Sequence, residues 1–456
     1  MIGNNPKVRP VWGCIFLSGV LLLTGCARYQ SRSIMPAQAA RHLSARRLDD
    51  PELQRFLAAM GEPAGHRWGL RALTLVAVYE RPDLVIANAD YALAQGGLVS
   101  ARALPNPELS ISPTYNVTNG NPSPLKIGPI VSFLLSSLGA RQAGIAAAQD
   151  QAAAARQAIV TAAWLVRARV RNALLALWSA RQQRIWAGRE QSLTVASAKA
   201  IDQRFHAGMV SSVTRAQADL AAEQAGFFAA TARRDLEMAR AQLAAAIGVP
   251  VVALNSIVVS TVAFDRLPTP GGFGDLTRIA LTTRPSVQAA LAHYAAAQQN
   301  LRAAVDSQFP GLSIGPGYHY DQGDSKYILA LALPLPILNQ NQGPIAVARA
   351  RRHLMAARFA AAQLHVLNQT GVAIVDYRAS ARELAAAAQI AASASAQTRA
   401  AEAAYRAGAT GRVRLLEAEQ AMVVARQNEL TAEIQLRAAL GRLEDSLHHR
   451  FFGVLP

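Results

Sequence analysis

The sequence predicts a mainly α-helical, internally duplicated protein with two long helical hairpins and four short β-strands. Three observations carry this prediction. Long alanine-rich segments have apolar residues at helical spacing, a pattern at Gly208 returns at Gly408, and four stretches of about ten residues read as strands, with the clearest apolar and polar alternation over 108–117. Of the 456 residues, 51% are hydrophobic but only 6% are aromatic. Because alanine favours helix and adds little core volume, closely packed long helices fit this composition better than a large globular core.

The two hairpin tips are predicted from a repeat with an offset of 200 residues. Residues 205–219 read FHAGMVSSVTRAQAD and residues 405–419 read YRAGATGRVRLLEAE. Each copy lies between two alanine-rich segments. A glycine after a helix supplies the left-handed residue that ends it and lets the chain reverse. We therefore expect Gly208 and Gly408 at the tips of two helical hairpins.

A second repeated sequence, outside the tips, indicates that a whole half of the chain is duplicated. Residues 81–84 read RPDL and residues 284–287 read RPSV, an offset of 203 residues. Identities continue at that offset from Ala89 and Tyr91, which match Ala292 and Tyr294. Since solenoid repeats run at roughly 20–50 residues, a period near 200 predicts two similar halves.

The N-terminus has the features of an export signal. Residues 1–25 combine Lys7 and Arg9 with an apolar stretch that is too short to span a bilayer as a helix. They end before Cys26 in the sequence LTGC, which resembles a bacterial lipobox, so Cys26 is the expected lipidation site. The alternative is an ordinary secretory signal with a chance cysteine. Residues 26–66 are polar and mixed, and we expect a lipid-anchored tether there.

Charge and motifs exclude several function classes. The net charge is +17, which is compatible with nucleic acid or anionic lipid as a partner. The arginines are scattered through helical segments, however, and an exported chain has little access to DNA. Neither His206 nor His353 has metal-ligand spacing, and no nucleophile-elbow, phosphate-loop or zinc-protease motif occurs. The sequence therefore predicts no enzyme, no cofactor, no metal site and no nucleic-acid partner.

The first half, residues 67–248, predicts helix, strand pair and helical hairpin in that order. A helical pattern over 70–103 ends at Pro105. Alternation predicts strands at about 108–117 and 126–135. A helix then runs from Leu138 to Phe205 with apolar residues in steps of four and three, as in a coiled coil.

The second half, residues 284–446, repeats that order after a proline- and glycine-rich stretch, 249–283, which we interpret as a linker. We expect strands at about 312–320 and 326–336, and a C-terminal tail over 447–456. From tip glycine to terminal glycine, the first half counts from 208 to 248 and the second from 408 to 441. The difference is one heptad, which predicts a shorter last helix with its apolar seam in phase.

The strands are the segments that suggest a membrane location. Strands of about ten residues cross a bilayer when they are tilted. Four strands cannot close a barrel, because known bacterial barrels start at about eight, and open edges do not occur in hydrocarbon. Membrane strands would therefore require several chains, and three chains would pool about twelve. The alternative is two small hairpins that pack on helices in water.

The order of elements, the duplication, the lipobox and the glycine tips resemble the outer-membrane efflux protein family, the TolC-like exit ducts. Residues 104–109 (LPNPEL) resemble the entry to the family's first strand. Residues 334–343 (PLPILNQNQG) resemble the exit from its last strand and are closest to the heavy-metal branch. The resemblance covers roughly residues 67–446.

This resemblance implies a homotrimer with a twelve-stranded barrel in the outer membrane and a helical α-barrel across the periplasm. It implies two protein partners, a periplasmic adaptor and an inner-membrane pump that is often of the resistance-nodulation-division type. The duct performs no chemistry. The chain is then a passive exit channel, lipid-anchored in the outer membrane and extending into the periplasm. The competing interpretation is a lipid-anchored periplasmic coiled-coil scaffold without a pore.

The family's tip residues carry over only in part. Gly208 and Gly408 match glycines at the tips that dock the adaptor. Tyr405 matches an aromatic residue that helps to close the tunnel, but its usual carboxylate partner is replaced by Thr214. Likewise, Thr410 stands where the family has a basic residue.

The acidic rings that narrow the tunnel are expected six and nine residues after the second tip glycine. Those positions hold Arg414 and Glu417, so one acid persists and the other is reversed in sign. Our hypothesis is that Arg414–Glu417 pairing near the trimer axis holds the tip closed. The alternative is a solvated pair three residues apart on one helix, with a contribution of a few tenths of a kcal/mol.

Overall fold

The computed structural model divides the chain into two units. The described residues are 28–62, 67–115, 117, 125–135, 137–309, 311–321 and 323–452. The first unit spans Met1–Arg46, where α2 (Pro36–Ser44) buries none of its side chains. The second unit spans Arg47–Pro456. The expected signal peptide, residues 1–25, and the expected lipidation site Cys26 lie outside the described residues.

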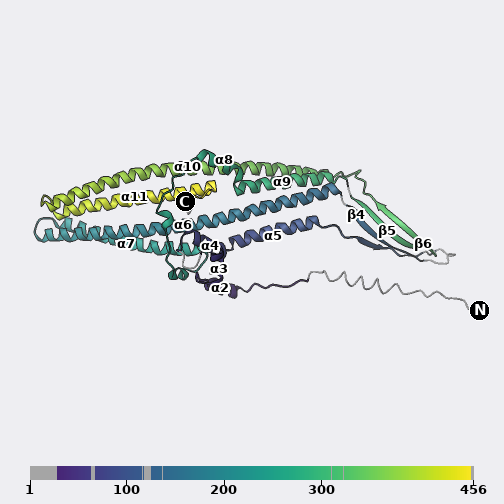
Figure 1. Ribbon diagram of the computed structural model, residues 1–456, viewed down its shortest axis with the longest axis horizontal. Helices are drawn as coiled ribbons and strands as arrows, with labels where there is room; N and C mark the ends of the chain where they lie inside the picture. Colours follow the sequence, from purple (N-terminus) through teal and green to yellow (C-terminus); the bar gives the residue numbers. More distant parts are fainter. Residues whose placement is uncertain are drawn as a thin grey trace, which may run out of the picture. The chain divides into compact units, whose positions relative to one another are not determined.

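Four long helices form two antiparallel hairpins in the second unit (Figure 1). The first hairpin pairs α6 (Leu138–His206) with α7 (Ser212–Ile247). The second pairs α10 (Gln342–Arg406) with α11 (Arg412–Leu447). The hairpins contact each other through α6 and α11. This confirms the predicted fold class, a mostly helical protein with long helical hairpins and small antiparallel strands.

Three shorter helices cover the half of α6 and α10 that lies away from the tips. α4 (Leu70–Glu80) and α5 (Pro82–Arg102) are separate helices, because the chain turns extended at Arg81 and Pro82 begins the next helix. The sequence had predicted one continuous helix over 70–103. α5 packs along α6, and α9 (Pro285–Asp306) packs along both α6 and α10.

The core follows the apolar seam that the sequence predicts on α6. Val166, Val170 and Leu177 are buried there. They belong to one cluster with Leu243 of α7 and Leu440 of α11. Burying such a side chain contributes about 1.5–3 kcal/mol, so this cluster joins both hairpins into one unit.

The expected tether is partly wrong, because residues 47–62 belong to the core. They contain α3 (Pro51–Ala59), in which Leu53 and Leu57 are fully buried. The Asp50 carboxylate caps α3 by accepting hydrogen bonds from the backbone N–H groups of Glu52 and Leu53. The polar composition of the segment concealed these two buried leucines.

The expected linker 249–283 is also folded. It contains the short 3₁₀ helices η1 (Val251–Ser256) and η2 (Val262–Phe264) and the helix α8 (Phe273–Thr283). Phe264 is fully buried, and its carbonyl accepts hydrogen bonds from the buried Arg437 guanidinium. Prolines and glycines shape this segment, but its apolar residues fix it to the helices.

The predicted heptad difference between the last helices of the two halves is wrong. α7 and α11 both have 36 residues, because α11 continues through Gly441 and ends at Leu447, with His448 as its C-cap. His448 has φ +50°, and it occupies the left-handed C-cap position that Gly248, with φ +84°, has in the first half. Gly441 is there for a packing reason, since an added Cβ would lie 3.0 Å from Arg171 Nε.

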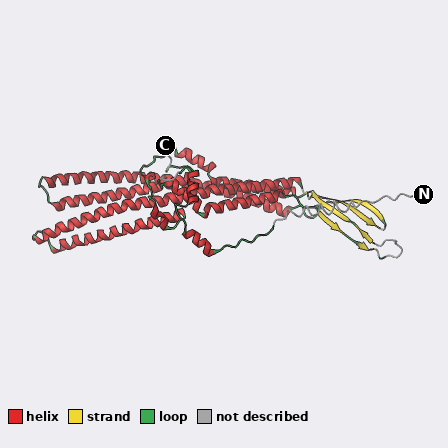
Figure 2. Cartoon of the chain, turned by 60° about the horizontal axis from the view of Figure 1, so that its bottom comes forward, coloured by secondary structure: helices red, strands yellow, loops and turns green. Residues whose placement is uncertain are grey.

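The strands form one antiparallel sheet. β1 (Glu108–Ile111) pairs with β4 (Pro129–Leu135), and β2 (Thr114–Tyr115) pairs with β3 (Leu125–Ile127). β3 and β4 pair with β5 (Leu312–Asp321), which pairs with β6 (Asp324–Ala332). The sheet thus has four strand positions, 108–115, 125–135, 312–321 and 324–332, and it lies at the end of the helices opposite the tips (Figure 2).

Three predicted strand boundaries need correction. The first strand is interrupted at Pro113, which has no N–H to donate. The second is interrupted at Gly128, where an added Cβ would lie 2.0 Å from the Tyr318 carbonyl oxygen. The last strand ends at Ala332 rather than at 336, since Pro334 and Pro336 cannot donate to a ladder.

Among the helices that the structure describes, none combines the length and the apolar character that a transmembrane helix needs.

Candidate functional site

Both hairpin tips have the same backbone geometry. Gly208 has φ +70° and Gly408 has φ +69°. At the first tip the N–H of Met209 donates to the Arg204 carbonyl at 2.8 Å, and at the second the N–H of Ala409 donates to the Ala404 carbonyl at 2.9 Å. This is the hydrogen bond of a Schellman motif. An added Cβ at either glycine would meet no other atom within 4 Å, so only the left-handed φ requires glycine.

Thr214 belongs to the cap of α7. The Ser211 hydroxyl accepts a hydrogen bond from the Thr214 backbone N–H at 3.2 Å, and the two hydroxyl oxygens lie 3.0 Å apart. The Thr214 side chain, which stands where the family has a carboxylate, therefore contacts the Ser211 hydroxyl at the start of its own helix. At the second tip the equivalent N-cap is Gly411, which provides no side-chain cap.

An ion pair across the first hairpin was not foreseen. Arg215 Nε of α7 lies 2.9 Å from Asp202 Oδ1 of α6, and the Arg215 guanidinium also lies 5.1 Å from the centre of the Phe205 ring. The Asp202 contact is ionic rather than a directed hydrogen bond. The signal was present in the sequence, because Asp202 and Arg215 are six residues before and seven residues after Gly208.

The second tip lacks this cross-link. Leu415 stands where the first tip has Arg215, and Glu402 forms its ion pair with Arg406 of its own helix. Tyr405 is 41% exposed, and its hydroxyl makes no hydrogen bond to any residue that the structure describes. The second hairpin is joined differently, since Thr398 Oγ1 of α10 donates to the Ala418 carbonyl of α11 at 3.0 Å.

Arg414 and Glu417 form a pair within one chain. Arg414 Nη1 donates to Glu417 Oε2 at 3.2 Å, on the first turns of α11. Their side chains are 69% and 52% exposed. In a single chain this is the solvated pair of the alternative interpretation, with a contribution of a few tenths of a kcal/mol.

The tips of the two hairpins enclose a cavity of about 620 Å³. Arg204 and Met209 line it from the first hairpin, and Arg412, Arg414 and Glu417 line it from the second. Glu417 is the one carboxylate among the lining residues that the structure describes, so arginine charge exceeds acidic charge in this cavity.

No resident metal site was identified. Across the described ranges, no group of three or more His, Cys, Asp or Glu side chains could hold a metal ion. The tips offer turns, charged side chains and a cavity, which are means of contact with another molecule.

A model of one protein family, described as outer membrane efflux protein, matches residues 76–249 and 276–447. The two matched segments correspond to the two halves and together cover well over half of the chain. The chain belongs to the outer membrane efflux protein family. This family consists of outer-membrane channels of tripartite efflux systems, which extend into the periplasm and are transport proteins rather than enzymes.

Solved structures of membrane proteins resemble this efflux protein in fold. A membrane protein from Pseudomonas aeruginosa has a TM-score of 0.67 and 22% identity, and the match covers 83% of this chain and 92% of that one. VceC from Vibrio cholerae has a TM-score of 0.67 and 20% identity, with coverages of 84% and 96%. At these identities the likeness establishes the fold alone.

A curated relative of this efflux protein is the cobalt-zinc-cadmium resistance protein CzcC of Cupriavidus metallidurans. It is 26% identical over 278 residues. The match covers 60% of this chain and 64% of CzcC, so the chain spans somewhat less than two thirds of the relative's length.

Proposed function

We propose that this efflux protein is the exit-duct subunit of a tripartite efflux pump. In this proposal three copies form a channel with a twelve-stranded barrel in the outer membrane and a helical tunnel in the periplasm. The observation that carries the proposal is the sheet of one chain, whose first and last strand positions each pair on one side only. An open edge in hydrocarbon leaves backbone groups unpaired at several kcal/mol each, so copies must join their sheets.

The faces of β6 support a position in lipid. Tyr327, Leu329 and Leu331 alternate on one face and are strongly exposed. Ile328 and Ala330 lie on the other face. A barrel strand alternates an apolar face toward lipid with a polar face toward the lumen, and Lys326 lies on the same side as Ile328 and Ala330.

The helices also support a closed ring. Exposed apolar residues occur on α5, among them Ile86 and Leu93, and on α10, among them Val347 and Leu354. α5 packs on α6 while α10 packs on α9 and α11, so these two exposed helices flank the bundle on different sides. Different faces that meet between copies give a head-to-tail interface, which forms a ring when the rotation from one copy to the next closes, as a threefold rotation does.

A pair of substitutions on β6 tests the barrel. Leu329→Arg puts a charge on the proposed lipid face, which costs about 2–4 kcal/mol at the bilayer midplane, so we expect little folded protein in outer membranes. Ala330→Arg is the matched control on the proposed lumen face. It should insert normally and lower single-channel conductance in planar bilayers. Equal insertion of both variants, or a monomer without conductance, would refute the proposal.

The tips are the proposed docking end. They lie opposite the sheet, they are exposed, and the cavity between them holds more arginine than acid. In this proposal the periplasmic adaptor binds at Gly208 and Gly408, and the inner-membrane pump delivers cargo through it. Arg414 and Glu417 are the proposed gate residues, since a threefold arrangement of α11 would bring three such pairs together, with Tyr405 and Thr214 beside them.

Lipid anchoring at Cys26 is part of the proposal and rests on the lipobox sequence. The anchor would attach the chain to the outer membrane independently of its strands. Labelled palmitate should enter the wild-type protein and not the Cys26→Ala variant. Labelling of both would contradict the assignment.

Divalent metal ions are the proposed cargo, which the CzcC relationship and residues 334–343 favour. A strain that lacks this protein should become more sensitive to cobalt, zinc or cadmium, and the full chain should restore resistance. Unchanged metal sensitivity together with increased drug sensitivity would assign a different cargo to the same channel.

A further inference from the structure

Each half has an arginine directly before a helix, and the two arginines differ in their partners. In the first half, Arg81 precedes α5, and its Nε donates to Asp83 Oδ2 at 2.9 Å. Arg169 of α6 binds the other oxygen of the same carboxylate at 3.1 Å. Asp83 thus neutralises Arg81 and also places an acid in the first turn of α5.

In the second half this carboxylate is missing. Arg284 corresponds to Arg81 and precedes α9, but Ser286 stands in the place of Asp83. Gln369, 200 residues after Arg169, accepts from Arg284 Nη1 at 2.9 Å, and the Ser446 carbonyl accepts from the same nitrogen at 3.3 Å. Arg284 Nε is buried and has no partner among the described residues. It is the same atom that binds the carboxylate in the first half.

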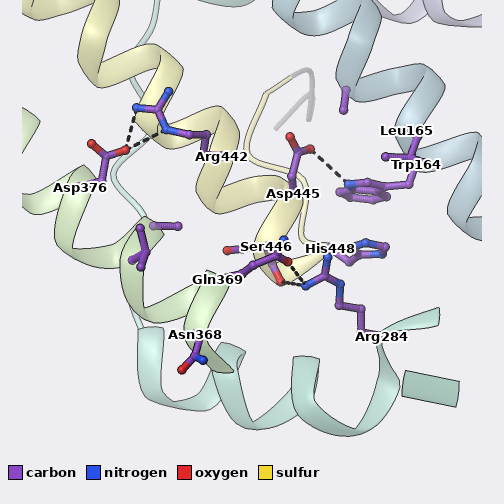
Figure 3. Close-up of a pocket in the computed structure, with 13 residues that line it drawn as sticks. Trp164, Leu165, Arg284, Asn368, Gln369, Asp376, Arg442, Asp445, Ser446 and His448 are labelled. Atoms are coloured by element: carbon purple, nitrogen blue, oxygen red, sulfur yellow. Dashed lines mark hydrogen bonds and ion pairs between the residues drawn. The ribbon is translucent and has the colours of Figure 1, made fainter. Parts of the chain in front are cut away.

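A cavity of about 540 Å³ lies beside Arg284, between α6, α10 and the end of α11 (Figure 3). Its wall includes a stacked aromatic pair, Trp164 and His448, whose ring centres are 4.7 Å apart. Leu165, Val372 and Ala373 extend the apolar wall. In the first half, glycine at 248 takes the place of His448, so the aromatic wall is particular to the second half.

The other charges of the cavity are compensated within the chain. Arg442 binds Asp376 at 2.7 Å, and Asp445 binds both terminal nitrogens of Arg171, at 2.9 and 2.7 Å. Burial lowers the pKa of His448 to about 4, so this ring is neutral at neutral pH. Arg284 is therefore the one cation of this cavity that contacts only neutral acceptors among the described residues.

We propose that this cavity binds a small organic monocarboxylate with an apolar body. The carboxylate pairs with the Arg284 guanidinium, as Asp83 pairs with Arg81 in the first half, and the apolar body lies against Trp164 and Val372. One negative charge matches one guanidinium that no carboxylate of the described residues contacts. The inference is independent of which cargo the channel carries.

Calorimetry on the purified full-length channel tests the proposal, with benzoate as the probe and benzamide as its neutral control. Wild type should bind benzoate and not benzamide. Ser286→Asp supplies the first-half carboxylate, so it should weaken benzoate binding about tenfold or more, as expected for loss of a charge-assisted hydrogen bond. The control variant Ser286→Asn has a side chain that is isosteric with aspartate but uncharged, and it should bind benzoate like wild type.

Arg284→Gln provides a second variant that should also lose binding, with helical content and oligomeric state checked by circular dichroism and native mass measurement. Two results would overturn the proposal. One is no benzoate binding by the folded wild-type channel up to about 10 mM. The other is equal binding by wild type, Ser286→Asp and Arg284→Gln.

Discussion

Glu444 offers the sharpest test of how the second unit is held together. Its side chain is fully buried near the end of α11, where it forms an ion pair with Arg167 and lies 3.5 Å from Arg171 Nη1. Its Oε2 accepts from the backbone N–H groups of Phe451 and Phe452 at 3.1 and 3.0 Å. One carboxylate therefore joins α6, α11 and the C-terminal segment. The expected tail over 447–456 is fixed at least as far as residue 452.

The Glu444→Gln substitution keeps the volume and removes the charge. Breaking a buried ion pair on one side costs about 3–5 kcal/mol, because the remaining charge stays buried without compensation. The lower end, about 3 kcal/mol, applies here, since Asp445 still neutralises Arg171. Unfolding entropy of about 2.1 cal/mol/K per residue gives roughly 0.9 kcal/mol/K for a chain of this length. We therefore expect the unfolding temperature to fall by about 3 °C.

Thermal unfolding followed by far-ultraviolet circular dichroism measures this change in the detergent-solubilised protein. The matched control is Glu417→Gln, which breaks an exposed pair and should shift the midpoint by less than about 0.5 °C. Hydrogen exchange adds a local measurement, because the Phe451 and Phe452 amides should lose protection in Glu444→Gln alone. Equal midpoints for both variants, with both amides still protected, would refute the reasoning.

Four further predictions concern the caps, the tips and the anchor. His448 has a folded pKa of about 4, lowered by burial and by Arg284 from an ordinary value of 6.5, so the unfolded state binds more protons between these values. Stability should therefore fall as pH drops from about 6.5 to 4, and His448→Gly should flatten this dependence in pH-dependent melts, whereas the control His353→Gln should not. Gly408→Val should cost about 1–2 kcal/mol through its left-handed φ alone, and limited proteolysis should cut the second tip faster than in Gly408→Asn. If Arg414–Glu417 pairing closes the tunnel, Arg414→Ala should raise single-channel open time, and unchanged gating would remove the pair from the mechanism. Cys26→Ala should abolish palmitate labelling and leave conductance intact.

The sequence alone determined the plan of the fold, because local chemistry encodes it. The repeat around Gly208 and Gly408 located both tips, since left-handed backbone at a helix end requires glycine or a close substitute. Alternation located the first strand position, short strand-like stretches bounded by turn residues located the other three, and steps of three and four located the seam of α6. The tip residues Tyr405, Arg414 and Glu417 were also found, although their role in gating stays a prediction.

The tertiary structure decided what depends on partners distant in the sequence. Gly441 was interpreted as a helix end, but it lies inside α11. The residue is glycine because the Arg171 side chain packs against it and leaves no space for a Cβ. Leu53 and Phe264 lie in segments whose composition suggested a tether and a linker, yet both side chains are buried. Ser286 does not stand out in the sequence. The structure shows its importance, because Arg284 Nε lacks the carboxylate that Asp83 provides to Arg81 in the first half. Spacing along a chain reports local backbone preference, whereas burial and pairing depend on contacts between segments that only the folded chain brings together.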